Sequence, residues 1–421
     1  MKRALVAVVL LLAGLAALVL ALNFRDESPL VADGAPPTAE QVARGEYLAR
    51  AGNCRGCHTE RGAAPYAGGR GIATPFGTVF APNLTPNPEH GLGRWTTAQF
   101  WRAMHNGRSA DGRLLYPAFP YTELTRITRE DSDALFAYLR SLPAVDKPNR
   151  PHALGFPYDT QAALAVWRAA FFRPGTVQHD AKRSAAWNRG AYLVEGLGHC
   201  NACHSSRNAL GASSGDALGG GLIPIQNWYA PALNDAREAG VAGWELPQIV
   251  SLLQGGVSNG GNVTGPMAEV VAGSLQHLRP DDLLAIATYL KELPQEPSAP
   301  PTVALAASAP AALRAQGADL YRQHCVDCHG EQGEGAAPAY PPLAGNRAVT
   351  MASPANLVHL VLEGGFPPST AANPRPYGMP PFATQLSDAE LASVLNFVRG
   401  AWGNEGSEVS ALDVAKLRSV R

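Results

Sequence analysis

The chain has 421 residues, with 34 basic and 35 acidic side chains and a formal net charge of −1. This length predicts about two to four domains, and the balanced charge argues against a nucleic-acid-binding surface, so no nucleic acid is expected as a partner. All six cysteines fall in three Cys-x-x-Cys-His pentapeptides, which leaves none for a structural disulfide.

The N-terminal segment has the pattern of an export signal or a membrane anchor. Lys2 and Arg3 precede an uninterrupted apolar run over 4–22, and a polar stretch follows it. The run is close to the roughly 20 residues that cross a bilayer and longer than the roughly 7 to 15 of a cleaved signal. We therefore expect a retained anchor, with cleavage as the alternative. Either way, the rest of the chain is expected at the periplasmic face of the cytoplasmic membrane.

Each Cys-x-x-Cys-His pentapeptide is typical of covalent c-type haem attachment. Two thiols on one helical turn can bond both vinyl groups of a porphyrin, and the next histidine then reaches the iron. A zinc site would pool its cysteines into one tetrahedral set, and a redox dithiol needs no histidine. We therefore expect three haem c groups. Their residues are Cys54, Cys57 and His58; Cys200, Cys203 and His204; and Cys325, Cys328 and His329.

Superposing the three motifs predicts three tandem repeats. A helical stretch precedes each motif and a second amphipathic helix follows it. The preceding stretches are expected over 39–51, 184–198 and 313–324, and the following helices over 128–142, 279–293 and 387–401. Two helices that bracket a haem motif are typical of a small cytochrome c domain, with loops and little strand around the porphyrin. The expected fold class is therefore all-α, with three class I cytochrome c domains behind the N-terminal helix.

Proline-rich stretches mark the expected boundaries. The division is 1–28 for the signal or anchor, 37–145 for the first cytochrome domain, 146–183 for a connector, 184–294 for the second domain, 295–310 for a linker of Pro and Ala, 311–403 for the third domain and 404–421 for a tail. Residues 158–173 of the connector include Trp167, Phe171 and Phe172. They are too apolar to be free, so this segment is expected to pack between the first two domains.

A haem iron that carries electrons also needs a sixth ligand, most often a methionine in a proline-held loop downstream. Met267, which follows Gly265 and Pro266, fits this role for the second haem. Met379, which precedes a pair of prolines, fits it for the third. The chain has five methionines, and filling a gap in the core is the alternative role for these two.

The first repeat lacks a methionine at this position. Alignment with the second repeat places Phe119 where Met267 stands, and phenylalanine cannot bind iron. His105, at the end of a helix expected over 97–106, is the candidate substitute, with Met104 or an open iron as alternatives. A bis-histidine haem would have a lower potential than the two Met/His haems.

Several short segments occur in order along the chain. They are Phe-Gly-Thr (76–78), Asn-Leu-Thr-Pro (83–86), Gly-Arg-Trp-Thr (93–96), Tyr-Pro-Ala (116–118), Trp-Asn-Arg-Gly-Ala-Tyr-Leu (187–193), Trp-Tyr-Ala-Pro (228–231) and Gly-Pro-Met-Ala-Glu-Val-Val (265–271). With these segments the chain resembles the triple-haem cytochrome c subunit of membrane-bound periplasmic dehydrogenases of alcohol, gluconate and related sugar acids. The resemblance runs over about 37–402.

The resemblance implies that the chain passes single electrons from a dehydrogenase to ubiquinone in the membrane or to a terminal oxidase. The dehydrogenase would be a quinoprotein, a flavoprotein or a molybdenum hydroxylase. This family usually has a methionine where the chain has Phe119, and the Phe form resembles cytochrome subunits that accompany molybdenum hydroxylases of aldehydes or N-heterocycles.

Two other functions stay open at this point. One is a periplasmic peroxidase-like haem enzyme that uses an open first haem, and the other is a cytochrome module of a terminal oxidase. The sequence shows no nucleophile beside a base and no phosphate-binding glycine loop. No substrate-converting site is therefore expected in the chain itself.

Overall fold

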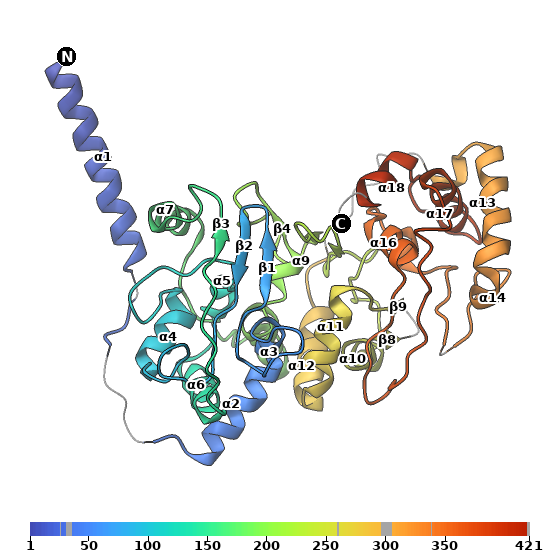
Figure 1. The fold of residues 1–421 in the computed structure, drawn as a ribbon. Coiled ribbons are helices and arrows are strands. Elements are labelled where there is room, and N and C mark those ends of the chain that lie inside the picture. Colours follow the sequence, from blue (N-terminus) through green and yellow to red (C-terminus); the bar gives the residue numbers. More distant parts are fainter. Residues whose placement is uncertain (26, 31–35, 259–260, 296–304, 338, 419–421) are drawn as a thin grey trace. The chain divides into compact units, whose positions relative to one another are not determined.

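The computed structural model describes residues 1–25, 27–30, 36–258, 261–295, 305–337 and 339–418. Regular structure in this part of the chain is mainly helical, with short strands between the helices (Figure 1). The chain divides into two compact units. The first comprises Met1–Ala181, Ala191–Ala202 and Asn208–Ala212, and the second comprises Lys182–Gly190, Cys203–Arg207 and Ser213–Arg421. The expected all-α class is confirmed in that the fold is mainly helical, and the division into three domains stays a prediction. Most of the linker expected over 295–310 lies outside the described residues.

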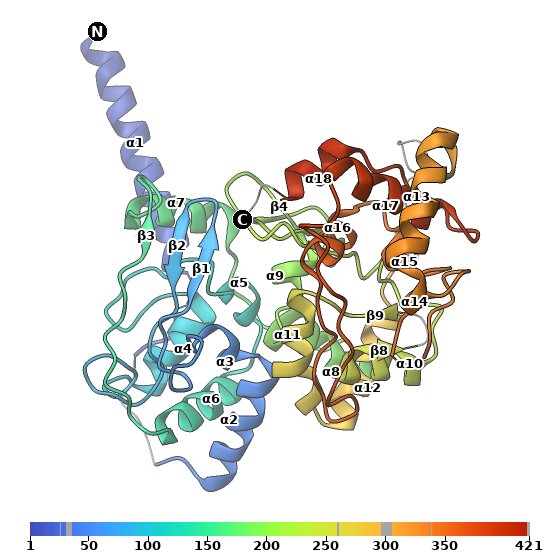
Figure 2. The same ribbon diagram turned by 45° about the vertical axis from the view of Figure 1, so that its right-hand side comes forward.

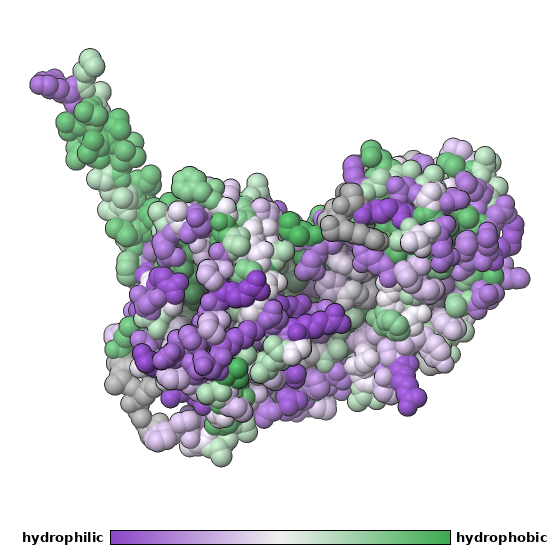
Figure 3. Space-filling view, viewed as in Figure 1, coloured by the Kyte–Doolittle hydropathy of each residue, from purple (hydrophilic) through white to green (hydrophobic). Residues whose placement is uncertain are grey.

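The chain begins with α1 (Lys2–Asn23), which is apolar along nearly its whole length. Its length and composition would allow it to cross a membrane, and no other helix among the described residues has both properties. Figure 3 shows hydrophobic side chains covering α1 where it extends from the first unit. Within α1 only the last residue, Asn23, is buried. The expected signal or anchor is thus an exposed helix whose C-terminal end enters the fold.

Residues 36–181 of the first unit contain the first Cys-x-x-Cys-His motif. The helices are α2 (Ala39–Ala51), α3 (Cys54–Cys57), α4 (Thr97–Asn106), α5 (Tyr121–Leu124), α6 (Arg129–Ser141) and α7 (Gln161–Phe171). An antiparallel sheet has the order β1 (Gly71–Thr74), β2 (Gly77–Phe80) and β3 (Ala153–Leu154). The β1–β2 hairpin was not predicted. It turns at Gly77, whose φ of 122° suits glycine alone.

The elements that follow form two further helical segments. Residues 185–291 form α8 (Ala185–Ala191), the π-helix η1 (Tyr192–Leu197), α9 (Asn201–His204), α10 (Leu246–Gly255), α11 (Pro266–Gly273), the 3₁₀ helix η2 (Leu275–His277) and α12 (Pro280–Lys291). Residues 306–418 form the 3₁₀ helix η3 (Ala306–Ser308), α13 (Ala311–His324), α14 (Val326–His329), α15 (Arg347–Thr350), α16 (Ala355–Glu363), α17 (Asp388–Gly400) and α18 (Ala411–Arg418). Two-stranded antiparallel pairs join β4 (Ser206–Arg207) to β5 (Ser213–Ser214), β6 (Gly221–Leu222) to β7 (Tyr229–Ala230) and β8 (Val257–Ser258) to β9 (Gly261–Asn262).

The helices expected after the motifs are α6, α12 and α17, and local sequence explains where they begin. The Thr128 side chain accepts a hydrogen bond from the Asp131 N–H at the start of α6. The Ser387 side chain accepts one from the Glu390 N–H, and the Glu390 carboxylate in turn accepts a bond from the Ser387 N–H. Such caps satisfy N–H groups that the first helical turn leaves without partners.

Of the helices expected before the motifs, the second differs from the prediction. The segment expected to be helical over 184–198 begins as α8 and continues as the π-helix η1. One more residue separates Gly190 from Cys200 than separates Gly45 from Cys54. The wider turn of a π-helix takes up this additional residue without breaking the helix.

A close helix crossing recurs three times, between α2 and α6, α8 and α12, and α13 and α17 (Figure 2). At each crossing a glycine lies against a carbonyl oxygen of the later helix. A Cβ built on Gly45 would lie 1.8 Å from the carbonyl oxygen of Ala134. The corresponding distances are 2.1 Å from Gly190 to Ala285 and 2.2 Å from Gly317 to Ser393. These distances are far below van der Waals contact, so only glycine permits the observed approach.

We predict that Gly45→Ala destabilises the protein by about 3 kcal/mol or more, because the added methyl group must push α2 away from α6. The control is Gly175→Ala, since no atom lies within 4 Å of a Cβ built there. It should change the free energy of unfolding by less than about 1 kcal/mol. Denaturant unfolding followed by far-UV circular dichroism measures both, and equal stability of the two variants would contradict the crossing.

Candidate haem sites

Each Cys-x-x-Cys-His motif lies on one short helical turn, namely α3, α9 or α14. In the first motif the His58 N–H donates to the Cys54 carbonyl oxygen at 3.0 Å, and His329 bonds to Cys325 in the same way at 3.0 Å. Residues three apart on a helix share a face, so the two thiols of a motif can reach one flat ligand. None of the six cysteines forms a disulfide.

The three motif histidines share one hydrogen bond, from the ring to a proline carbonyl. The Nδ1 atom lies 2.9 Å from the Pro82 oxygen in His58, 2.7 Å from that of Pro231 in His204, and 3.1 Å from that of Pro341 in His329. A carbonyl oxygen can only accept, so Nδ1 carries the proton and Nε2 keeps its lone pair. This is the tautomer that ligates a metal through Nε2 while its other nitrogen fixes the ring.

The surroundings of these rings keep them uncharged. Loss of solvation lowers the pKa of His58, His204 and His329 below the usual 6.5, while the bond to the proline carbonyl acts weakly in the opposite direction. A protonated imidazole has no lone pair for a metal. The fold therefore holds all three histidines in the protonation state that iron ligation requires.

A glycine folds the loop after each motif back over the histidine. The N–H of Gly68, Gly220 or Gly335 donates to the carbonyl oxygen of the motif histidine at 2.9, 2.9 and 2.8 Å, respectively. These glycines have φ values of 70°, 78° and 64°, in the left-handed region. A Cβ built on Gly68 would also lie 2.5 Å from the Pro82 carbonyl carbon. The glycine thus sets the distance between the motif and the loop that carries the proline.

The proline carbonyls were missed by sequence reasoning, although the sequence contains a signal for them. Each proline is followed two positions later by leucine, in Pro82-Asn-Leu, Pro231-Ala-Leu and Pro341-Pro-Leu. The proline lies 24, 27 and 12 residues beyond the motif histidine, so the recurring signal is the spacing of proline and leucine and not its distance from the motif. The acceptor is nevertheless a backbone oxygen, which no side-chain pattern identifies directly.

The chemistry of the thiols fits haem better than zinc. Burial raises the pKa of Cys54 to about 12, with a further contribution from the neighbouring Cys57. Burial likewise raises the pKa of Cys325 to about 11, with a contribution from Cys328. A zinc site would gather further ligands beside each pair of thiols, and among the described residues no group of three or more His, Cys, Asp or Glu side chains is placed to hold a metal ion. Neutral thiol pairs beside an imidazole with an available Nε2 are the donor set that covalent haem c uses.

Met267 lies in the first turn of α11 and is half-buried. The helix begins after Gly265, which has a φ of 56° and packs on the Trp228 ring, where an added Cβ would lie 2.7 Å from ring carbons. Pro266 then occupies the first helical position, which suits its fixed φ. Glycine and proline therefore fix the direction in which the chain enters the turn that carries Met267.

Met379 is held by backbone pairing rather than by a helix. Its N–H donates to the Gly365 oxygen at 2.8 Å, and the Gly365 N–H donates back at 3.0 Å. The half-buried side chain packs against a buried cluster that includes Tyr321, Val358 and Leu391. The ligand roles of Met267 and Met379 stay predictions, and the structure holds both in constrained backbone.

Phe119, which aligns with Met267 in the sequence, lies in a loop of the first unit just before α5. Its N–H donates to the Tyr116 oxygen at 3.0 Å, and its ring centroid lies 6.4 Å from that of Tyr121. The side chain is half-buried. An aromatic ring thus stands at the position that aligns with Met267 in the sequence.

His105 is buried at the end of α4. Its ring stacks on Trp101, with centroids 4.4 Å apart, and its Nδ1 atom lies 2.7 Å from the Thr125 carbonyl oxygen. This carbonyl sets the same tautomer as in the motif histidines, with Nε2 as the acceptor nitrogen. Met104, the alternative ligand, is also buried. The same contacts would serve a structural histidine, so the ligand role of His105 stays a prediction.

Known proteins resemble the chain over most of its length. The cytochrome c family model matches residues 42–143 and 314–402. The chain is 38% identical to the alcohol dehydrogenase (quinone) cytochrome c subunit of Gluconobacter oxydans, over 90% of this chain and 82% of that protein. It is 36% identical to the gluconate 2-dehydrogenase cytochrome c subunit of Pantoea cypripedii, over 90% of this chain and 89% of that protein. The chain belongs to this family of dehydrogenase cytochrome c subunits.

A third relative is a longer protein. The chain is 40% identical to a nicotinate dehydrogenase subunit of Pseudomonas putida, over 92% of this chain but 32% of that longer protein.

Membership of the cytochrome c family confirms covalently bound haem c as the cofactor class. The two stretches that match the family model contain the first and third motifs, and the second motif lies between them.

We predict that Met379→Leu converts one haem to a high-spin form that binds carbon monoxide and lowers its reduction potential by about 0.1 V or more, because thioether ligation raises the potential. The matched control is Met351→Leu, which removes a buried methionine of the same segment. Optical and electron paramagnetic resonance spectra measure both. A Met379→Leu protein with the spectra and potentials of the wild type would contradict the assignment.

We predict that His105→Ala converts the first haem from low to high spin, whereas Met104→Leu leaves it unchanged. Both side chains are buried in α4, so circular dichroism must show that each variant folds before its spectrum is interpreted. An unchanged low-spin signal in His105→Ala would mean that the histidine has a structural role. A high-spin haem already present in the wild type would indicate an open iron instead.

Proposed function

We propose that the chain binds three haem c groups and passes single electrons from a dehydrogenase to an acceptor at the membrane. The observation that carries this proposal is the recurrence of one arrangement in three segments, in which a histidine Nδ1 bonds to a proline carbonyl beside a left-handed glycine. The three glycine-mediated helix crossings also support it. A single haem domain would need each of these features only once.

The residues of the chain attach and orient the haem groups. In this proposal the six cysteines form the thioether bonds, while His58, His204 and His329 present Nε2 to the iron. Met267 and Met379 supply the sixth ligands of the second and third haems. The haem iron supplies one-electron redox chemistry. The protein supplies attachment, ligand identity and the exclusion of water, which together set the potentials.

Different ligands would give the haems different potentials. With His105 as its sixth ligand, the first haem would have a lower potential than the two haems that have methionine, because thioether ligation raises the potential. Electrons would then run favourably from the first haem towards the second and third. If His105 is not a ligand, the first iron has an open sixth position, because Phe119 cannot bind iron. The lack of a methionine at position 119 therefore favours a peroxidase-like haem enzyme as the second candidate function.

The relatives indicate the class of electron donor. Their names include dehydrogenases of alcohol, gluconate and nicotinate. We propose a periplasmic dehydrogenase as the partner, which would be a quinoprotein, a flavoprotein or a molybdenum hydroxylase. Phe119, in place of the family's usual methionine, favours a molybdenum hydroxylase of an aldehyde or an N-heterocycle as the partner. Nicotinate is an N-heterocycle, so the name of the third relative supports the same class of partner. The acceptor would be ubiquinone or a terminal oxidase.

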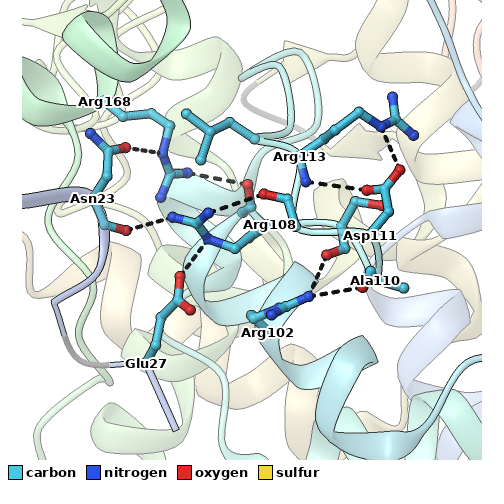
Figure 4. Close-up of polar contacts among 12 residues, drawn as sticks. Asn23, Glu27, Arg102, Arg108, Ala110, Asp111, Arg113 and Arg168 are labelled. Atoms are coloured by element: carbon cyan, nitrogen blue, oxygen red, sulfur yellow. Dashed lines mark hydrogen bonds and ion pairs between the residues drawn. The ribbon is translucent and has the colours of Figure 1, made fainter. Parts of the chain in front are cut away.

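The polar contacts at the C-terminal end of α1 support our proposal that this helix is a retained anchor at the periplasmic face of the membrane (Figure 4). The buried Asn23 side chain donates to the Ala165 oxygen at 2.9 Å and accepts from Arg168 Nε at 2.9 Å. Arg108 donates to the Asn23 oxygen at 3.0 Å and pairs with Glu27 at 2.5 Å. Cleavage at the end of the N-terminal segment would leave two buried guanidinium groups without these partners, which is costly.

Purification of the tagged full-length protein in mild detergent tests the proposal, with the untagged strain as control. We expect a large dehydrogenase subunit to copurify with its organic or molybdenum cofactor, and its substrate to reduce the haems by one electron each. Copurification of oxidase subunits instead would support the oxidase module. Turnover of hydrogen peroxide with a reduced donor, without a dehydrogenase, would support the haem enzyme.

A further inference from the structure

We propose that the outward face of α7 lies on the lipid surface of the membrane beside α1, so that the first unit rests on the bilayer as well as being tethered to it. This inference depends on the retained anchor proposed above. It assigns a membrane-contacting role to the connector between the first two motifs.

The inward face of α7 buries apolar side chains, as an ordinary surface helix does, but the helix also buries its charged residue and exposes an apolar outward face. Its outward positions Ala162, Val166 and Ala170 are exposed and recur every four residues, and 58% of Val166 is accessible. Phe171 adds a ring that is 38% exposed, whereas Arg168, the helix's one charged residue, is 3% exposed. Surface helices normally bury the apolar face and expose the charges. An apolar outward face with an inward charge fits an environment less polar than water.

Arg168 is fixed inside the unit by contacts that leave it no role at the surface. Besides its bond to Asn23, it donates to the Gly107 oxygen at 3.2 Å. Its guanidinium lies 5.1 Å from the centroid of the Tyr121 ring and 4.9 Å from that of Phe172. These contacts set the rotation of α7 about its axis. The apolar face therefore cannot turn inward without breaking a buried polar network.

The position of α7 along α1 is also fixed. Asn23 bonds to Ala165, in the middle of α7, so this helix lies beside the C-terminal end of α1. α1 has 22 residues and, at about 1.5 Å per residue, spans about the 30 Å of a hydrocarbon core. Its C-terminal end would thus lie at the membrane–water interface. α7 would lie at that depth too.

The residues next to α7 suit an interface. Phe156 is 84% exposed, and the Tyr158 ring beyond it is exposed as well. Aromatic residues with one polar end are enriched where lipid meets water. Asp159 and Arg173, which are both exposed, lie just outside the two ends of the helix, where they would be among the headgroups. The apolar face is thus bounded by polar residues that can stay hydrated.

Lipid is the favoured occupant because the patch continues from a segment that would itself be surrounded by lipid. A soluble partner would have to cover α7 while bordering the headgroups around α1. An amphipathic surface helix binds an interface by burying its apolar side to about 5 to 10 Å. A second protein on this face is the alternative that the experiment must exclude.

The test uses full-length, haem-loaded protein in vesicles of phosphatidylethanolamine and phosphatidylglycerol. A nitroxide spin label is attached at Val166→Cys, since the haem-bound cysteines are thioethers and do not react. Ala43→Cys is the matched control, because Ala43 is an exposed small residue on α2 of the same unit. Leu11→Cys, within α1, reports on the anchor. Collision rates with oxygen and with a water-soluble nickel complex are measured at each label.

We expect the ratio of oxygen to nickel collisions to be several-fold higher at positions 166 and 11 than at position 43. A ratio at 166 equal to that at 43, with position 11 in lipid, would overturn the membrane-contacting face and leave the anchor standing. A label at 166 shielded from both reagents would mean that a protein covers α7, which also overturns the proposal. Position 11 in water would overturn the anchor itself.

Discussion

An imidazole that is to bind iron must present one bare nitrogen in a fixed direction, and here a proline carbonyl imposes that condition. The bond to Nδ1 places the proton, orients the ring and leaves Nε2 available. The carbonyl is in reach because a left-handed glycine, such as Gly68, folds the loop back against the motif. The motif itself is reached from a helix whose glycine touches a carbonyl of the crossing helix. Two close backbone approaches therefore define each site.

The first unit differs from the repeated plan in two connected ways. Its loop carries Phe119 in place of methionine, and its unit alone contains the N-terminal apolar helix. Arg108 lies three residues after His105, just beyond the C-terminal end of α4. It forms an ion pair with Glu27, which follows the C-terminal end of α1. The helix end that carries the candidate sixth ligand is thus adjacent to the polar network that holds the C-terminal end of α1. The candidate sixth ligand and the proposed anchor thus depend on neighbouring residues.

Much of the helical framework could be predicted from sequence, because it depends on local patterns. Periodicity located α2, α6 and α17, and the caps Thr128 and Ser387 begin their helices as expected. The π-helix at 192–197 could be recognised only by comparing the spacing of glycine and cysteine between repeats. The apolar composition of 158–173 predicts that this segment packs against the fold. Which side of α7 points inward cannot be predicted, because it depends on the bond between Arg168 and Asn23, a residue far away in the sequence. Backbone acceptors such as Pro82 carry no side-chain signature.

The proposed function requires that each of the three motifs holds one covalently bound haem. The most direct measurement combines the haem content per chain, from the pyridine haemochrome spectrum, with mass mapping of peptides from the same preparation. We expect three haems, one on each of the peptides that contain Cys54, Cys200 and Cys325. Two haems per chain, with the Cys200 peptide recovered unmodified from mature periplasmic protein, would contradict it.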